Sequence, residues 1–526
     1  MRQHRTPRLL GTLLLVAAAG ISVAGAAPSA AGHTATPLGQ VVPAPASAHA
    51  SGSPYRVTGD TRIRVDDSRE ARRVGEYLAD ILRPSTGYRL PVTSHGSGGI
   101  QLHLAATHLG AEGYRIDSGS SGVTITAAEP AGLFHGVQTL RQLLPPAAEK
   151  DSVQPGPWLI AGGTIKDTPR YGYRGAMLDV SRHFFTIAQV KRYVDELALY
   201  KVNKLHLHLS DDQGWRIAID SWPRLAGYGG STQVGGGQGG FYTKADYQEI
   251  VRYAASRYLE VVPEIDMPGH TNAALASYAQ LNCDGVAPPL YTGTDVGFSS
   301  LCVGKSVTYD FVDDVIRELA AITPGRYLHI GGDEAHSTSH ADYVTFMDKV
   351  QPLVAQYGKT VIGWHQLTGA TPAKGAIAQY WGLDDTSAEE KAQVAKAARN
   401  GTGLVLSPAD RIYLDMKYTA DTPLGQDWAG LVEVKRAYDW DPGNYLPDAP
   451  SSAIRGVEAP LWTETIVSDA DIDYMTFPRL PGVAELGWSP ASTHDWDAYK
   501  VRLAAQGPRW DALGIGYYKS PQVPWV

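Results

Sequence analysis

Charged residues and cysteine are scarce in this chain, and only its first residues contain a long apolar run. Of its 526 residues 19% are charged and 43% are hydrophobic. This balance excludes a disordered chain or a coiled coil and indicates a globular protein with a sizeable core. The formal net charge of −8 gives no electrostatic reason to expect nucleic acid or an anionic membrane as a partner. The length favours two or three domains.

The first residues have the pattern of a targeting segment. Arg2, Arg5 and Arg8 precede an uncharged apolar run at residues 9–27 that ends in small residues. We therefore predict a signal peptide over residues 1–27 and a secreted protein that has no membrane contact after cleavage. A retained membrane anchor is the alternative, because the run is nearly long enough to span a bilayer. Residues 28–53 are rich in alanine, proline and serine, which predicts a disordered leader.

The only cysteines are Cys283 and Cys302. An even count in an exported chain favours one disulfide between them. A catalytic cysteine is the competing interpretation, but nothing around either residue resembles a nucleophile motif. The sequence therefore predicts a Cys283–Cys302 disulfide.

Phenylalanine is rare as well, with 8 residues against 12 tryptophans, and every tryptophan lies from Trp158 onward. This distribution separates two regions of the chain. Residues 54–168 are expected to form a small α/β accessory domain without convergent carboxylates. Its expected helices are residues 71–82 and 132–144, and its expected strands are residues 100–104, 113–116 and 122–126.

From residue 171 onward, short β patterns alternate with helical patterns. The expected strands are residues 175–181, 204–210, 260–266, 326–331, 360–364, 376–381, 403–406 and 456–461. Eight β–α units in about 350 residues predict a TIM barrel over residues 169–526, so the whole chain belongs to the α/β class. The alternative is a doubly wound open sheet, but no glycine-rich phosphate turn follows a first strand.

The predicted strands end in polar, acidic and indole side chains, whereas the strand bodies are mostly apolar. In chain order these residues are Asp179 and Arg182; His208, Asp211 and Asp212; Asp266 and His270; Asp333, Glu334 and His336; Trp364 and His365; Trp381; Tyr413 and Asp415; and Trp462 and Glu464. Active sites of TIM barrels lie at the C-terminal ends of the strands. The asymmetry therefore predicts a functional site on that face.

The segment HIGGDEAH at residues 329–336 places two adjacent carboxylates, Asp333 and Glu334, after two glycines that allow a tight turn. Beside the other acids and indoles, a sugar-cleaving site is a better interpretation than a helix cap. Adjacent carboxylates do not easily straddle a sugar ring, as the acid and the nucleophile of an ordinary retaining glycosidase do. With Glu334 as the acid, Asp333 is better placed to hold a substituent of the same sugar.

Several segments together resemble glycoside hydrolase family 20, the β-N-acetylhexosaminidases, in their secreted bacterial type. They are YRGAMLDVSR at residues 173–182, HLHLSDDQGWR at 206–216, PEIDMPGH at 263–270 and HIGGDEAH at 329–336, and GLFHGVQTLRQLL at 132–144 resembles the end of the family's small N-terminal domain. The resemblance implies an exo-acting, retaining enzyme without cofactor or metal. It would release terminal β-linked GlcNAc or GalNAc from an oligosaccharide or glycoconjugate by substrate-assisted catalysis.

The resemblance also implies a role for each site residue. Glu334 is expected to act as general acid and then as general base, while the acetamido oxygen of the substrate attacks and forms an oxazolinium ion. Asp333 is expected to accept the acetamido N–H, and Tyr413 to donate to the acetamido oxygen. The expected pocket walls are Trp364, Trp381 and Trp462; the residues expected to hold sugar hydroxyls are Arg174, Asp415 and Glu464; and those expected to orient Glu334 are Asp211 and His270.

Two other functions remain as alternatives. His206 and His208 face the same way on one strand, as the zinc ligands of a metal-dependent barrel amidohydrolase do, although no other histidines complete a ligand set at matching strand ends. A non-catalytic carbohydrate-binding protein on the same scaffold is the second alternative. It would be expected to lack at least one of Asp333, Glu334 and Tyr413, and all three are present.

Overall fold

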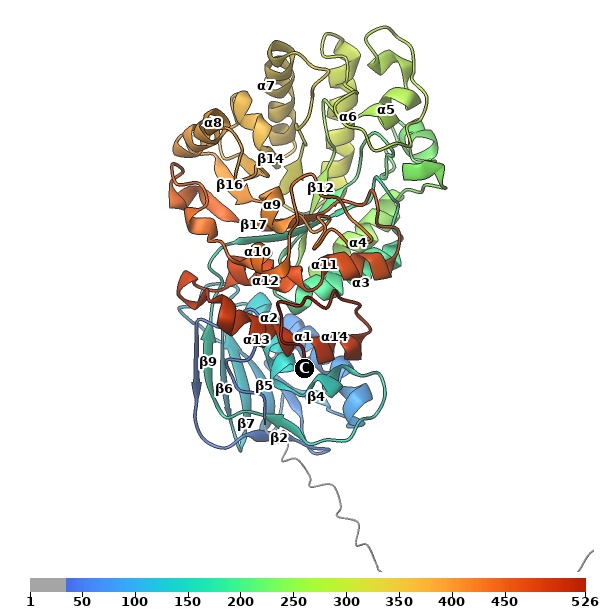
Figure 1. Cartoon of the computed structure of the whole chain (residues 1–526). Coiled ribbons are helices and arrows are strands. Elements are labelled where there is room, and N and C mark those ends of the chain that lie inside the picture. The colour runs from blue at the N-terminus through green and yellow to red at the C-terminus, as the bar shows by residue number, and fades with distance from the viewer. Residues whose placement is uncertain (1–34) are drawn as a thin grey trace, which may run out of the picture. The chain divides into compact units, whose positions relative to one another are not determined.

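A computed structural model describes residues 35–526, so the predicted signal peptide lies outside the described residues. Its C-terminal part is a closed barrel of eight parallel strands (Figure 1). The strands are β10 (Tyr173–Asp179), β11 (Lys204–His208), β12 (Glu260–Glu264), β13 (Tyr327–His329), β14 (Thr360–Trp364), β15 (Ile377–Tyr380), β16 (Gly403–Leu406) and β17 (Ile454–Leu461). Each strand pairs with the next in the chain, and β17 closes the barrel onto β10. The predicted TIM barrel is confirmed.

Helices surround the barrel strands (Figure 1). The longer ones are α3 (Ile187–Leu199), α4 (Lys244–Ser256), α6 (Ser306–Ile322), α7 (His340–Gln356), α8 (Ala388–Arg399) and α12 (Arg479–Trp488). A 3₁₀ turn at His365–Gly369 follows β14 in place of a helix. Helix α3 shows how the sequence sets these elements: Thr186 and Gln189 form a capping box, and Val190, Val194 and Leu197 bury one face.

The accessory domain is built on a seven-stranded sheet in the order β1-β9-β6-β7-β5-β3-β4. The strands are β1 (Ser47–Ala50), β3 (Ile63–Val65), β4 (Val92–Thr93), β5 (Gly99–Leu104), β6 (Tyr114–Gly119), β7 (Gly122–Ala127) and β9 (Gly163–Asp167). Helices α1 (Arg69–Thr86) and α2 (Pro130–Leu143) pack against this sheet, and β2 (Tyr55–Val57) pairs with β8 (Trp158–Ile160). Arg509, on α14 (Gly507–Leu513), donates to the carbonyls of Gln142 and Leu144 at 3.3 and 2.9 Å. These bonds tie the accessory domain to the C-terminal helices.

The structure corrects the prediction that residues 28–53 are disordered, for the part from residue 35 onward. Leu38, Val41 and Val42 are buried, and β1 pairs antiparallel with β9. The amide of Gln142 bonds both the N–H and the carbonyl of Val42, at 2.8 and 2.6 Å. The N–H of Ala44 donates to Glu485 of α12 at 2.8 Å. A short apolar segment within an alanine-, proline- and serine-rich stretch therefore folds because it fills the seam between the accessory domain and the barrel.

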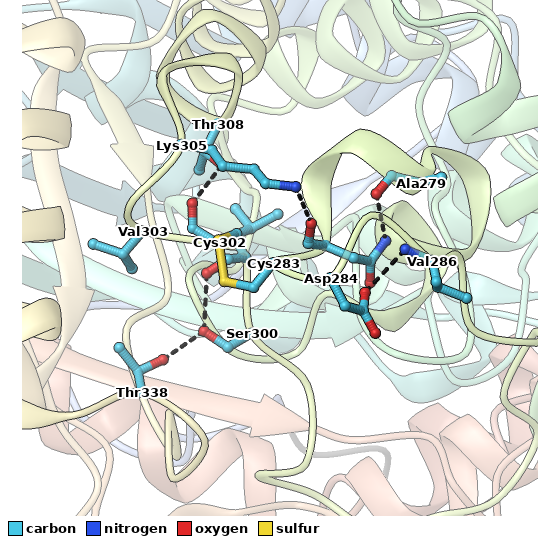
Figure 2. Close-up of a disulfide and its surroundings, with 12 residues drawn as sticks. Ala279, Cys283, Asp284, Val286, Ser300, Cys302, Val303, Lys305, Thr308 and Thr338 are labelled. Carbon is cyan, nitrogen blue, oxygen red and sulfur yellow. Dashed lines mark hydrogen bonds between the residues drawn. A yellow bond between two sulfur atoms is a disulfide. The ribbon is translucent and has the colours of Figure 1, made fainter.

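Cys283 and Cys302 form a disulfide (Figure 2). The loop that it closes contacts the segment after Glu334: Ser300 shares a hydrogen bond with Thr338 at 2.5 Å, and Ser337 donates to the carbonyl of Gly297 at 2.9 Å. The disulfide thus supports one rim of the C-terminal barrel face. Within residues 35–526 no helix combines the length and the apolarity needed to cross a membrane.

Candidate active site

The two adjacent carboxylates lie after β13, at the C-terminal end of the barrel. The chain turns there through Gly331, whose φ is +64°; a Cβ at this position would lie 1.7 Å from Oδ1 of Asp266, so the turn requires glycine. Glu334 and His270 have positive φ angles too, of 44° and 55°. Side chains rarely adopt this conformation, and such strain concentrates at functional sites.

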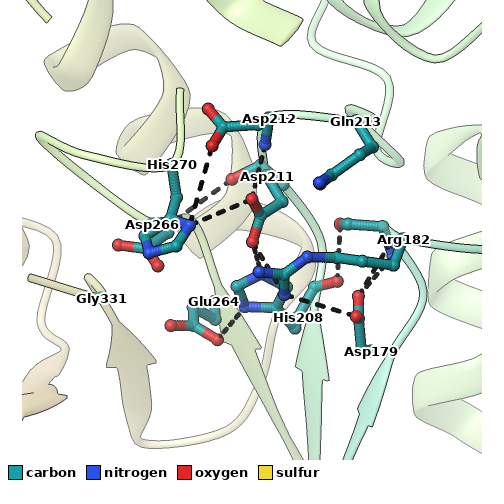
Figure 3. Close-up of polar contacts among 12 residues, drawn as sticks. Asp179, Arg182, His208, Asp211, Asp212, Gln213, Glu264, Asp266, His270 and Gly331 are labelled. Atoms are coloured by element: carbon teal, nitrogen blue, oxygen red, sulfur yellow. Dashed lines mark hydrogen bonds and ion pairs between the residues drawn. The ribbon is translucent and has the colours of Figure 1, made fainter. Parts of the chain in front are cut away.

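His270, on the segment after β12, contacts both carboxylates. Its Nε2 lies 3.3 Å from Oε2 of Glu334 and 3.7 Å from Oδ2 of Asp333. Its Nδ1 donates to Oδ1 of Asp211 at 3.1 Å, and Nη1 of Arg182 lies 2.9 Å from Oδ2 of the same aspartate (Figure 3). The structure therefore brings Asp211, His270, Asp333 and Glu334 into one chain of contacts.

Burial and mutual charge set the ionisation of this cluster. Burial raises the pKa of Asp333 to about 6, although His270 opposes the shift. Burial and the neighbouring Asp333 raise the pKa of Asp266 well above its usual range. Burial disfavours the charged form of His270, but Asp211, Asp333 and Asp266 outweigh it and raise the pKa of this imidazole well above its usual value. His270 is therefore a cation among the carboxylates.

Indole and phenol rings line the same face of the barrel. Trp364 is fully buried and its ring centre lies 5.8 Å from that of Trp462. The ring of Tyr413 lies 6.2 Å from Trp462 and 5.9 Å from Trp428, and Trp428 lies 6.1 Å from Trp381. Sequence reasoning did not single out Trp428, which lies on the loop between β16 and β17 and is 48% exposed. Its only signal was its membership of the tryptophan-rich region.

Arg174 does not lie in this site. It is the second residue of β10, at the N-terminal end of the barrel, and it is buried. Its Nη1 lies 3.3 Å from Glu112 of the accessory domain, its Nε donates to the carbonyl of Lys201 at 2.9 Å, and its guanidinium lies 4.9 Å from the ring centre of Trp488. The prediction that Arg174 holds sugar hydroxyls is wrong, because this arginine joins the two domains at the opposite end of the strand.

Arg182 is the arginine at the C-terminal end of β10. Its Nη1 lies 3.4 Å from Asp179 and 2.9 Å from Asp211, and its guanidinium stacks 4.8 Å from the ring centre of Trp462. Its position after a strand end was a usable sequence signal. The planar donors expected of Arg174 are therefore supplied to the pocket by Arg182.

Buried polar atoms without a hydrogen-bond partner occur in several places among residues 35–526, and some of them belong to residues around this pocket. Among the latter are Nε of Arg182, Oδ2 of Asp266, Oδ1 of Asp333, Oδ2 of Asp415 and Oε2 of Glu464. Buried polar groups are normally paired. Asp415 also accepts the backbone N–H of Trp462 at 3.5 Å, which places its carboxylate beside the indoles. The unpaired atoms on this face are therefore available to form hydrogen bonds with a polar ligand.

The histidine pair that suggested zinc lies within a network of carboxylates. His206 contacts Glu458 and Glu264 at 2.7 and 2.9 Å, and His208 contacts Glu264 and Asp211 at 2.5 and 2.6 Å. The ligand atoms of His206, Glu264 and His329 lie within 4.8 Å of one another, and so do those of His208, Asp211 and Asp266.

An indole-lined pocket with unpaired carboxylates, at the C-terminal face of a (β/α)₈ barrel, is the arrangement expected of a glycoside hydrolase.

The chain belongs to glycosyl hydrolase family 20: the model of the family's catalytic domain matches residues 171–491, and the model of its domain 2 matches residues 39–168. A β-N-acetylhexosaminidase of Cellulomonas fimi is 40% identical over 478 residues, which are 90% of this chain and 94% of the relative. The structure of the family 20 β-N-acetylhexosaminidase from Streptomyces coelicolor A3(2) has a TM-score of 0.93 and 76% identity, and the match covers 94% of this chain and 100% of that one. A mutant β-hexosaminidase of Streptomyces plicatus in complex with its product GlcNAc has a TM-score of 0.93 and 77% identity, over 94% of this chain and 99% of that one. This chain is therefore a hydrolase of the β-N-acetylhexosaminidase type.

The position of Arg182 leads to a test against Arg174. We expect Arg182→Lys to lower kcat/KM for an aryl N-acetyl-β-glucosaminide by about 10- to 100-fold, because lysine keeps the charge but loses the planar fork of donors. Arg174→Lys is the matched control: it should lower the melting temperature by loosening the contact with Glu112 and leave kcat/KM close to wild type. Equal losses of activity in the two variants would contradict the assignment.

Proposed function

We propose that the enzyme removes terminal, non-reducing β-linked GlcNAc or GalNAc with retention of configuration and uses the substrate's 2-acetamido group as the nucleophile. The contact of both Asp333 and Glu334 with the single imidazole of His270 carries this proposal. In a retaining glycosidase with two working carboxylates, the acid and the nucleophile flank the sugar. Two carboxylates that contact one imidazole lie on the same side and do not flank the sugar. If the substrate supplies the nucleophile, a second carboxylate on the opposite side of the sugar is not needed.

In the proposed first step, Glu334 gives its proton to the glycosidic oxygen while the acetamido oxygen attacks the anomeric carbon. The bond to the leaving group breaks and an oxazolinium ion forms. Asp333 accepts a hydrogen bond from the acetamido N–H and offsets the positive charge that develops there. Tyr413 donates to the acetamido oxygen; burial raises the pKa of its hydroxyl well above the usual value, so the proton stays on the phenol.

In the proposed second step, Glu334 takes a proton from a water molecule whose oxygen attacks the anomeric carbon. The bond from that carbon to the acetamido oxygen breaks, and the neutral acetamido group is restored. Each step inverts the anomeric carbon, so the two together retain its configuration. The indoles of Trp364, Trp381 and Trp462 hold the acetamido group beneath the anomeric carbon, a positioning effect that lowers the entropic part of the barrier.

Exo action is proposed from the unpaired polar atoms around the pocket. Arg182, Asp415 and Glu464 offer a charged donor and two carboxyl groups to the hydroxyls of one terminal sugar. Trp428, half exposed beside Trp381 and Tyr413, offers a ring face to the leaving sugar. A sugar chain would therefore enter by its non-reducing end.

Time-resolved ¹H NMR of the hydrolysis of tetra-N-acetylchitotetraose tests the proposed outcome. We expect the β anomer of GlcNAc to appear first and to mutarotate later, and we expect the monosaccharide and the trisaccharide as the first products. Initial release of the α anomer would overturn retention. Initial release of the disaccharide would overturn exo action.

We also propose that the enzyme works outside the cell. The signal peptide predicted at residues 1–27 supports this proposal. The Cys283–Cys302 disulfide supports it as well, because disulfides persist in oxidising compartments. Mass spectrometry of the protein in the culture medium should find an N-terminus close to residue 28. Full-length protein confined to the cells would contradict export.

A further inference from the structure

The function described so far does not use the histidine pair His206 and His208, nor the carboxylate that both contact. Glu264 is the last residue of β12 and is paired with His208 in the barrel register. It is fully buried. Oε2 of Glu264 accepts from Nε2 of His206 at 2.9 Å and from Nδ1 of His208 at 2.5 Å. One carboxylate thus contacts both histidines of the motif. Figure 3 shows its contact with His208.

The other oxygen of Glu264 reaches the pocket wall. Oε1 accepts from the indole Nε1 of Trp364 at 3.0 Å, the polar contact of this buried ring. The ring of His208 lies edge-on to Trp462, with ring centres 4.8 Å apart. Glu264 therefore holds one indole directly and stands next to the histidine that supports another.

Through His208, the same carboxylate reaches the acid/base. Nε2 of His208 donates to Oδ2 of Asp211 at 2.6 Å, Oδ1 of Asp211 accepts from His270 at 3.1 Å, and His270 lies 3.3 Å from Glu334. Both carboxylate oxygens of Asp211 are used: Oδ2 faces His208 and Arg182, and Oδ1 faces His270 and the backbone N–H of Asp212. His208 and His270 thus contact opposite oxygens of one carboxylate. A shift of His208 would therefore displace the imidazole of His270, which contacts Glu334.

We propose that Glu264 is a positioning residue that holds two parts of the active site in register: the Trp364 wall of the acetamido pocket and the His208–Asp211–His270 chain behind Glu334. The inference deepens the proposed function and rests on it, since it concerns the residues that substrate-assisted catalysis requires. It also accounts for the His-x-His motif. His208 would serve to orient catalytic groups by hydrogen bonds, whereas His206 joins Glu264 to Glu458.

An ionised carboxylate meets the demands of this position, and an amide does not. Burial alone would raise the pKa of Glu264, but His208, His329 and His206 outweigh it and hold the pKa well below the usual range. Burial likewise opposes the charged form of His208, whose pKa Glu264 and Asp211 raise well above the usual value. The other titratable groups that face this network are His329, whose Nδ1 lies 3.1 Å from Oε1 of Glu264, Glu458 across His206, and Asp266, whose pKa burial raises well above its usual range.

Glu264→Gln tests the proposal because glutamine has one acceptor oxygen and one donor nitrogen. In one orientation the amide oxygen accepts from the histidines, and the amide NH₂ then faces the N–H of Trp364, so two donors oppose each other. In the other orientation the NH₂ faces His208, and the negative charge that favours the protonated form of that ring is lost. We expect kcat/KM to fall by about 10- to 100-fold on an aryl N-acetyl-β-glucosaminide, the effect of losing a charge-assisted hydrogen bond. The loss should be larger on diacetylchitobiose, whose poor leaving group depends more on a well-placed acid. Binding of free GlcNAc should weaken, because the pocket wall has moved.

Glu458→Gln is the matched control. Glu458 is as deeply buried and accepts from Tyr173 at 2.6 Å, from His206 at 2.7 Å and from Gln379 at 2.8 Å, but it does not contact Trp364 or His208. The Glu458→Gln substitution should lower the melting temperature as Glu264→Gln does and leave kcat/KM near the wild-type value. Glu264→Asp keeps the charge but places it one methylene further from its partners, so its kcat/KM should fall between those of the wild type and Glu264→Gln. This variant tests the proposal if Glu264→Gln does not fold.

The wild-type chain is assayed first, since a failure to cleave the N-acetyl-β-glucosaminide would refute the proposed function itself. With an active wild type, the positioning role predicts a loss in the Glu264 variants that grows with the leaving group's need for the acid. Wild-type kcat/KM in a folded Glu264 variant would overturn the role. So would an equal loss on both substrates and in Glu458→Gln, which is the signature of general loosening of the core.

Discussion

Glu334→Gln is expected to lower kcat for unactivated oligosaccharides by about 10³-fold, within the range for loss of a positioned general acid–base group. The amide has the size of the carboxyl but cannot give a proton to the glycosidic oxygen or take one from water. The loss of rate that Glu334→Gln causes in the first step should be smaller for aryl substrates whose leaving group departs without protonation. Hydrolysis of diacetylchitobiose beside a dinitrophenyl glycoside measures both effects.

Binding of GlcNAc separates chemistry from recognition in this variant. Glu334→Gln should bind the monosaccharide with a Kd close to wild type, because the pocket walls and the hydroxyl-binding residues are untouched. Glu70→Gln, at an exposed carboxylate on α1 of the accessory domain, is the matched control and should keep full activity. Near-normal turnover of diacetylchitobiose by Glu334→Gln would remove Glu334 from the role of acid.

Asp333→Asn is the second large effect, with an expected loss of about 10²- to 10³-fold in kcat on 2-acetamido substrates. Asparagine keeps an oxygen that can accept the acetamido N–H, but it lacks the negative charge that offsets the developing oxazolinium ion. Steady-state kinetics on an aryl N-acetyl-β-glucosaminide measures the loss. Asp348→Asn, an exposed aspartate on α7, should be neutral. A wild-type kcat in Asp333→Asn would show that the charge has no part in catalysis.

The pH profile gives an independent reading of Asp333. Burial raises its pKa to about 6, and the proposed role requires the deprotonated form. Activity of the wild type should therefore fall as the pH drops through about 6, because protonation removes the charge. An asparagine at this position cannot titrate, so the Asp333→Asn variant should lose this limb of the profile. Retention of the same limb would assign it to another group of the cluster.

The barrel was predictable because its signal is repeated along the chain. Eight short apolar runs, most of them separated by an amphipathic helical pattern, leave few other architectures. The folding of residues 35–53 was not predictable from composition. Leu38, Val41 and Val42 gain their burial from the accessory domain and from α12 at once, and a local pattern does not report such long-range partners.

Some residues of the candidate site were predictable from the sequence, and others were not. Asp333, Glu334 and the indoles follow strand ends, and the geometry of a parallel barrel gathers all strand ends on one face. Arg174 was misplaced because a resemblance in a whole motif does not say which of its two arginines faces the pocket. The position on the strand does: Arg174 begins β10, whereas Arg182 follows its C-terminal end.

Glu264 and Trp428 show what local patterns cannot reveal. Glu264 is the last residue of β12, and its role cannot be inferred until its four partners on other barrel strands are known. Trp428 lies on a loop without regular structure, so its place beside Trp381 and Tyr413 depends on the path of that loop. Both are set by contacts between segments far apart in the chain.

The most direct test of the central claim compares an aryl N-acetyl-β-glucosaminide with the matching aryl β-glucoside, which differs only at the 2-position. If the acetamido group is the nucleophile, the glucoside should react at least about 10⁴-fold more slowly, because it lacks an internal nucleophile whose effective molarity reaches about 10⁵–10⁸ M. Comparable values of kcat/KM for the two substrates would contradict substrate-assisted catalysis.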